Sequence, residues 1–163
     1  MNSTDLKNLI IAKHPLPEWA TFEKLRKSTV FVKNARIADV ATFNTYPSKN
    51  KRIAYEIKIH RSDFIKELEQ PAKRKWLEEL FHETYFVCLP GVCKPEEVTE
   101  GWGLYYPTKN GKQLRRKIIA KYREVEENVP YLFTLSIFRR LCENLNNERR
   151  KIRYVDGEEF TSE

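Results

Sequence analysis

Cysteine is scarce in this 163-residue sequence, and its few copies follow no metal-binding pattern. The three cysteines, Cys88, Cys93 and Cys142, include no Cys-x-x-Cys pair, which argues against a zinc ribbon and against a disulfide framework. We therefore expect reduced, mostly buried thiols, as in a cytoplasmic protein. Histidine is equally scarce, and none of the three histidines has the i, i+4 spacing of a helical metal pair.

Long hydrophobic runs are also absent. The longest unbroken run covers residues 85–89, far short of the roughly 20 apolar residues that a membrane span needs. Residues 1–5 begin no secretory signal. Repeats, low-complexity stretches and Gly/Ser linkers are missing too, so we expect one cytoplasmic domain over residues 1–147 and a polar tail over residues 148–163.

Positive charge exceeds negative charge in this chain. The formal net charge is +7, and 40% of the residues are hydrophobic and 12% aromatic. This composition is typical of a folded basic protein, so nucleic acid is the first partner to consider, although many small basic proteins bind none. No RNP motif, helix-turn-helix or zinc finger is present, so contacts with DNA would be mainly to its phosphate backbone.

The most informative segment is RIADVATFNTYPSKNKRIAYEIKIH, residues 36–60. It predicts an antiparallel hairpin that turns near Pro47 or Ser48, with Asp39 on the first strand and Glu56 and Lys58 on the second. Alternate residues of a strand share a face, so Glu56 and Lys58 point the same way, and the register sets Asp39 opposite one of them. The other face carries an apolar row of Ile53, Tyr55, Ile57 and Ile59 beside Ala38, Val40 and Thr42.

Two carboxylates and a lysine on one face favour phosphoryl chemistry. Anionic oxygens repel one another unless a hard cation lies between them, and Mg²⁺ is commonly held by one or two carboxylates together with substrate phosphate oxygens. Asp39, Glu56 and Lys58 therefore suggest metal-assisted phosphoryl hydrolysis. The alternative is a solvated hairpin face with a cross-strand Asp–Lys pair and a spare glutamate.

Asp39, followed after sixteen residues by Glu56-Ile57-Lys58, resembles the signature of the PD-(D/E)xK nuclease superfamily. The flanking sequence is similar to the MmcB-type DNA-repair endonucleases of bacteria over roughly residues 36–116. Two features depart from that pattern, because Lys75-Trp76 comes later than usual and Ala38 replaces a proline before Asp39. The stretches that carry the resemblance are Arg36-Ile37-Ala38-Asp39, Glu56-Ile57-Lys58-Ile59, Arg61-Ser62-Asp63-Phe64, Tyr85-Phe86-Val87 with Pro90, and Gly103-Leu104 with Gly111.

The resemblance implies a restriction-endonuclease-like fold, that is, a single α/β domain whose mixed β-sheet core is flanked by helices. It further implies that Asp39, Glu56 and the backbone carbonyl of Ile57 hold Mg²⁺, for which Mn²⁺ would substitute. Some members add a carboxylate from the helix before the hairpin, where Glu23 is the best placed residue and Glu18 the second.

The resemblance also assigns a role to Lys58. Its ammonium would orient the attacking water and offset the negative charge that develops on the phosphate. The implied substrate is DNA, in the context of repair, and many nucleases of this fold act as homodimers.

Local patterns predict the other elements. Helices are expected over residues 4–13 and 18–28, after Ser62 as an N-cap, from Pro71 onward and over residues 130–145. Strands are expected over residues 83–89, 102–106 and 113–120, with a turn at Asn110-Gly111 between the last two. The strand before Ser62 and the strand over residues 83–89 should pair in parallel through a crossover.

Basic clusters occur at residues 73–75, 115–117, 139–140 and 149–151. Any of them could follow a DNA backbone, although most charge runs are merely solvated. We expect contacts with duplex DNA from Arg115, Arg116 and Lys117, together with His60 and Arg61 beside the hairpin.

The sequence thus leaves three functions open. The leading hypothesis is a Mg²⁺-dependent DNA endonuclease. The second is a nuclease-fold module or complex subunit that binds nucleic acid without cutting it. The third, with little support beyond composition, is an interaction protein that uses Trp19, Trp76 and Trp102 as contacts.

Overall fold

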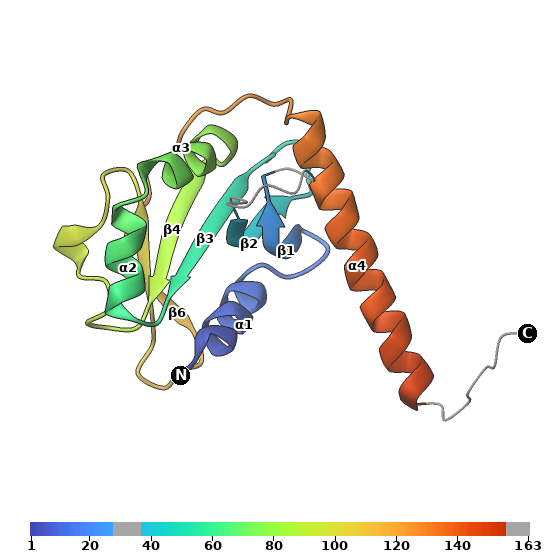
Figure 1. Cartoon of the computed structure of the whole chain (residues 1–163), viewed down its shortest axis with the longest axis horizontal. Coiled ribbons are helices and arrows are strands. Elements are labelled where there is room, and N and C mark those ends of the chain that lie inside the picture. Colours follow the sequence, from blue (N-terminus) through green and yellow to red (C-terminus); the bar gives the residue numbers. More distant parts are fainter. Residues whose placement is uncertain (28–36, 156–163) are drawn as a thin grey trace, which may run out of the picture.

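A six-stranded mixed sheet forms the centre of the computed structural model, and helices cover both of its faces (Figure 1). The structure describes residues 1–27 and 37–155, the last seven by their backbone alone. The prediction of a single α/β domain with a mixed sheet flanked by helices is confirmed. The elements in these ranges are α1 Ser3–Lys13, β1 Trp19–Arg26, β2 Ile37–Asn44, β3 Arg52–Lys58, α2 Arg61–Leu68, α3 Pro71–Leu80, β4 Glu83–Cys88, a 3-10 turn Pro95–Glu97, β5 Gly103–Pro107, β6 Leu114–Ile118 and α4 Tyr131–Val155.

The strands lie in the sheet in the order in which they occur along the chain. β1, β2 and β3 are antiparallel neighbours, β4 and β5 run parallel to β3, and β6 returns antiparallel to β5. Parallel neighbours require a crossover connection, and α2 and α3 form the one between β3 and β4. Because this crossover begins directly after Lys58, it brings two helices over the end of β3.

The hairpin of β2 and β3 has the predicted register. Val40 pairs with Tyr55, and the chain turns at Pro47. Continued by one residue, this register brings Asp39 next to Glu56. The hairpin therefore joins the two predicted metal ligands at the end of the sheet where α2 begins.

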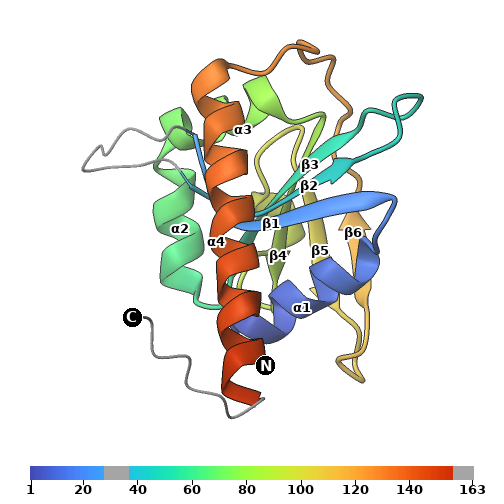
Figure 2. The same cartoon turned by 90° about the vertical axis from the view of Figure 1, so that its right-hand side faces the viewer.

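Each face of the sheet has its own hydrophobic core. One core lies beneath α2, α3 and the start of α4, and the fully buried Phe64, Trp76 and Phe133 belong to it. α1 covers the other face, where Leu6 and Ile10 pack near tyrosines of β3, β4 and β5. Figure 2 shows α4 passing beside β1, against which it packs. Burying one large apolar side chain contributes about 1.5–3 kcal/mol, so these residues hold the helices against the sheet.

The expected helix over residues 18–28 is wrong, because Trp19–Arg26 forms the edge strand β1. The prediction rested on Phe22 and Leu25, whose spacing of three fits a helical face. In a regular strand these two side chains would lie on opposite faces, yet both enter the core beneath α3. Lys24 explains the difference, because its positive φ of 49° interrupts the alternation. Ser28 lies outside the described residues.

The expectation that all three cysteines are reduced is also wrong, although two of the three are buried, as expected. Cys88 and Cys93 form a disulfide, and Cys142 is an exposed free cysteine. β4 ends at Cys88, and the chain then turns through Gly91, whose φ of +88° suits a residue without a side chain. This turn returns Cys93 to a Cα–Cα distance of 6.1 Å from Cys88, within the range that a disulfide spans.

Two helix boundaries differ from the predictions. α2 begins at Arg61 with His60 as its N-cap residue, because the His60 carbonyl already accepts the N–H groups of Asp63 and Phe64. α4 continues through residue 148 to Val155, so the predicted start of the tail does not coincide with a helix end, and residues 156–163 lie outside the described part. No helix in the described ranges is long and apolar enough to cross a membrane.

Candidate active site

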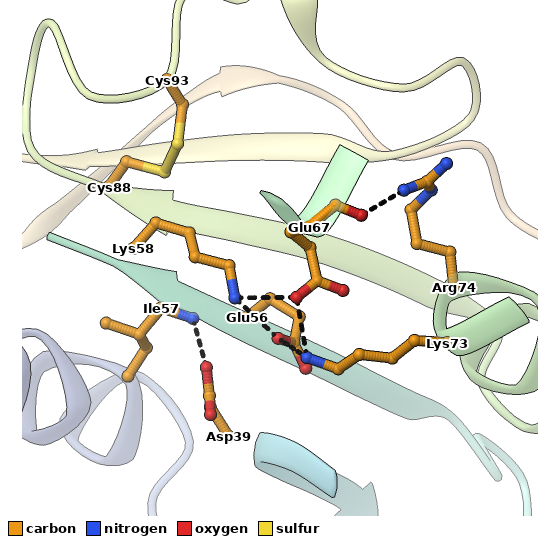
Figure 3. Close-up of polar contacts among 9 residues, drawn as sticks. All are labelled: Asp39, Glu56, Ile57, Lys58, Glu67, Lys73, Arg74, Cys88 and Cys93. Carbon is orange, nitrogen blue, oxygen red and sulfur yellow. Dashed lines mark hydrogen bonds and ion pairs between the residues drawn. A yellow bond between two sulfur atoms is a disulfide. The ribbon is translucent and has the colours of Figure 1, made fainter. Parts of the chain in front are cut away.

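Asp39 lies where the ladder between β2 and β3 ends. Its carboxylate Oδ2 accepts the backbone N–H of Ile57 at 2.8 Å, as Figure 3 shows. A side-chain oxygen of β2 thus accepts a hydrogen bond from the β3 backbone, just beyond the last backbone pair of the ladder, Val40 with Tyr55. Asp39 is only partly buried, so it remains partly accessible to solvent at the end of this ladder.

Glu56 carries the most perturbed carboxylate of the hairpin. Its side chain is fully buried, Oε2 accepts hydrogen bonds from Lys58 and Lys73, and no described residue provides a partner for Oε1. Burial, and next the negative charge of Asp39, raise the pKa of Glu56 from 4.5 to about 7. The two lysines oppose this shift but do not cancel it.

Lys58 points from the end of β3 into the same cluster. Its ammonium lies 3.1 Å from Glu56 Oε2 and 3.1 Å from Glu67 Oε2. Burial alone would lower the pKa of Lys58, but the charges of Glu56 and Glu67 outweigh it and raise the pKa above the ordinary lysine range. Lys58 therefore remains positively charged at neutral pH.

Sequence reasoning missed two members of the cluster, Glu67 of α2 and Lys73 of α3. Lys73 Nζ lies 2.7 Å from Glu56 Oε2 and 2.8 Å from Glu67 Oε2 (Figure 3). Glu67 follows Phe64 by three residues and so falls on the buried side of α2, where an acidic residue is itself a signal of function. Lys73 belongs to one of the four basic clusters that could follow a DNA backbone but is not among the expected DNA contacts, and Arg74 of the same cluster donates a hydrogen bond to the Glu67 carbonyl.

The four side chains form a ring of alternating charge, in which each ammonium contacts one oxygen of each glutamate. The pKa of Glu67 is lowered, because the two lysines outweigh its burial, whereas the pKa of Glu56 is raised. The two glutamates differ first because Glu56 is more deeply buried than Glu67, and next because the negative charge of Asp39 acts on Glu56. A proton taken up by the ring therefore resides on Glu56.

The residues at the end of β3 fit a divalent cation in part. Glu56 Oε1 is buried without a described partner, and Asp39 adds a second carboxylate beside it, which matches the small ligand set that Mg²⁺ takes from proteins. The Ile57 carbonyl would be the third protein ligand. No group of three or more His, Cys, Asp or Glu side chains in the described ranges has metal-binding geometry, so solvent and phosphate would complete the coordination.

The two additional carboxylates proposed from sequence are not part of the site. Glu23 pairs with Val40 in the sheet, which puts it on the α1 face, and its carboxylate forms an ion pair with Lys7. Glu18 forms an ion pair with Lys49 at 2.6 Å. The expected helix is absent, because Glu18 lies in a turn before β1 and Glu23 lies in β1, on the opposite face of the sheet from the site.

The predicted DNA-contacting residues do not form one surface. Arg115 and Lys117 lie on the side of Tyr106, which belongs to the same core as α2 and α3, whereas Arg116 pairs with Tyr105 and faces the α1 side. All three are exposed and lie on the edge strand β6.

His60 and Arg61, at the start of α2, differ in their freedom to reach DNA. His60 is exposed at the start of α2. Arg61 is held by both oxygens of Glu97 and by the Val92 carbonyl. His60 thus remains a candidate DNA contact, whereas Arg61 has a structural role in fixing the loop that follows the disulfide.

Comparison with known proteins supports the fold and no more. No family model and no curated protein matches the chain. A solved structure of a protein of unknown function from Silicibacter pomeroyi is similar over 99% of this chain and 98% of that chain, with a TM-score of 0.62 and 14% sequence identity. At that identity the similarity extends to the arrangement of the sheet and helices, and it assigns no activity.

Proposed function

We propose that this protein is a divalent-cation-dependent endonuclease that hydrolyses DNA phosphodiester bonds. The observation that carries the proposal is the convergence of Asp39, Glu56 and Lys58 at the end of the β2–β3 hairpin, with Glu56 fully buried and one of its oxygens without a described partner. Burial of the ionic Glu56 and Lys58 beside a third charge, that of Asp39, costs stability, and such a cost is typical of a functional site.

The order of elements agrees with this proposal. A helix, three antiparallel strands, a helical crossover and a parallel strand follow one another. The order expected with the resemblance to the PD-(D/E)xK superfamily is a helix, a hairpin, a helix and a strand, and the chain has these elements with β1 as an additional strand before the hairpin. Fold alone does not define an activity, so the argument rests on the side chains.

Each residue has a chemical task in the proposed reaction. Asp39, Glu56 and the Ile57 carbonyl would hold Mg²⁺, which when bound lowers the pKa of water and neutralises charge on the phosphate. Lys58 carries a permanent positive charge that stabilises the additional negative charge of the transition state. Asp39 also fixes the backbone at Ile57, so the ligands of the hairpin keep their spacing.

DNA as the substrate is supported by charge. The chain carries a net charge of +7, and Arg115 and Lys117 are exposed on the face of the sheet that also carries the site. Contacts of lysine and arginine with phosphates release counterions and do not depend on base sequence. We therefore expect binding to the backbone, with cleavage directed by DNA structure and not by sequence.

A second candidate function is a module that binds nucleic acid without cutting it. The observation in its favour is the ring of Lys58, Lys73, Glu56 and Glu67, in which two lysines already neutralise two buried glutamates. A ring of this kind could serve the fold alone. Asp39 argues for the enzyme, because its carboxylate adds negative charge that the ring does not need.

The two functions are distinguished by incubating the full chain with linear, nicked and branched DNA in Mg²⁺ or Mn²⁺, with a chelator as control. The endonuclease proposal predicts cleaved products that appear only with the divalent cation. The module predicts retarded protein–DNA complexes and intact DNA under every condition, and this result would reject the proposed activity.

A further inference from the structure

Lys73 occupies the side of Glu56 that faces α3. Its ammonium is 2.7 Å from Glu56 Oε2, closer than that of Lys58 at 3.1 Å. We infer that Lys73 is an internal counter-ion on Glu56 Oε2 and that a divalent cation bound at the unpartnered Oε1 repels its ammonium from the cluster, so that α3 regulates metal loading. This inference rests on the proposed function, because it concerns the same site.

Charge balance is the first argument. Without a divalent cation, the negative charges of Asp39, Glu56 and Glu67 face the positive charges of two lysines. A cation with two positive charges would leave an excess of positive charge at a buried point, where like charges repel strongly. One ammonium therefore has to leave when the cation binds.

The position of the two lysines decides which one leaves. Lys58 extends from a strand that is paired on both sides, and its side chain is 9% exposed. Lys73 lies in the first turn of α3, near the helix start at Pro71, and its side chain is 20% exposed. The Lys73 side chain can reach solvent by rotation about its own bonds. The Lys58 side chain is more deeply buried, so it stays beside Glu56.

Lys73 also stabilises the protein when its ammonium points toward Glu56. Burial of Glu56 without a positive partner would destabilise the protein, because an unpaired buried carboxylate loses its hydration. Lys73 supplies this partner together with Lys58 in the cation-free protein, and its ammonium is the closer of the two. Once released, its ammonium lies at the mouth of the site, where it can contact a phosphate of the DNA backbone.

Binding of Mn²⁺ alone tests the inference. The full-length wild type is compared by calorimetry with Lys73→Met, which keeps the length of the side chain but removes its charge. Lys75→Met is the matched control, because Lys75 is an exposed lysine of the same helix. We expect Lys73→Met to bind Mn²⁺ about 10-fold more tightly than the wild type, since one opposing charge is gone, and Lys75→Met to behave as the wild type.

A second measurement uses the wild type, so it does not depend on how Lys73→Met folds. Acetic anhydride labels free amines, and mass spectrometry reads the labelling of each lysine. Saturating Mn²⁺ should increase the labelling of Lys73 several-fold and leave Lys75 unchanged.

The outcomes separate the inference from the proposed function. Equal Mn²⁺ affinity in the wild type and Lys73→Met, with no change in Lys73 labelling, would overturn the counter-ion role and leave the cation site intact. Failure of every variant to bind Mn²⁺ would remove the cation site itself, and the inference with it. Loss of binding in Asp39→Asn is expected if the ion occupies the proposed site.

Discussion

Asp39 and Ile57 are joined by a hydrogen bond of 2.8 Å between a carboxylate oxygen and a backbone N–H. The bond links the predicted first ligand to the strand that carries the second ligand, and it lies just past the last ladder pair of the hairpin. Asp39 therefore has two separable roles, one as a hydrogen-bond acceptor and one as a charge.

Two substitutions separate these roles. Asp39→Asn retains an oxygen that can accept the Ile57 N–H, so the free energy of unfolding should change little. Asp39→Ala leaves the N–H without its partner and should lower that free energy by about 1–3 kcal/mol. Urea unfolding of both variants checks this prediction, and equal stability of the two would show that the bond contributes nothing.

Glu56 predicts a pH dependence of stability. Its pKa is raised from 4.5 to about 7 by burial and by the charge of Asp39, so between these values the unfolded chain has lost a proton that the folded chain keeps. This group therefore makes the protein less stable as pH rises through that window, by up to about 3 kcal/mol. Replacement by Gln should remove this contribution.

His14 changes the stability with pH in the opposite direction. Burial lowers the pKa of His14 from 6.5 to about 4, which makes the protein more stable as pH rises between those values. The measurement is therefore the difference in unfolding free energy between Glu56→Gln and the wild type from pH 4.5 to 7, in chelator, with Glu127→Gln as the exposed control. A difference that does not change with pH would contradict the raised pKa.

The Cys88–Cys93 disulfide closes a short loop with a sequence separation of five residues. Replacing both cysteines by alanine should lower the free energy of unfolding by about 2 kcal/mol, the loop-closure contribution for so short a segment. Thiol titration of the denatured, unreduced protein should detect one thiol, from Cys142, and three after reduction. Three thiols before reduction would show that the bond is absent.

Arg115 and Lys117 should contribute to DNA binding through phosphates. Their combined replacement by alanine should reduce the slope of log affinity against log salt by about 2, since each phosphate contact contributes about 0.9. Arg116→Ala is the matched control, because Arg116 faces the opposite side of the sheet beside Tyr105. Filter binding measures the slopes, and equal slopes for both variants would assign these residues to ordinary solvated surface.

Local patterns of the sequence predicted the hairpin and most of the sheet. The alternation around Asp39 and Glu56 defines the register because a shift by one residue would move every side chain to the other face. β1 was not predicted, because Lys24 interrupts the alternation and leaves Phe22 and Leu25 with the spacing of a helical face.

Half of the charged ring was not predictable from the hairpin. Glu67 and Lys73 reach Glu56 only because Phe64 and Trp76 fix α2 and α3 over the end of β3. This proximity depends on how the crossover packs against the sheet, so no fixed sequence spacing relates Glu67 and Lys73 to Glu56. The disulfide was missed for a similar reason, because the turn after Cys88 determines whether the second sulfur comes within reach.

The most direct test of the proposed activity is the single-turnover rate of DNA cleavage in Mg²⁺ by the wild type and by Asp39→Asn, a variant that is expected to fold. Removal of one charge from a preorganised catalytic site should reduce the rate by ~10²-fold or more while DNA affinity stays close to that of the wild type. Equal cleavage rates for the two proteins, or a folded wild type that binds DNA and cuts none, would contradict the account.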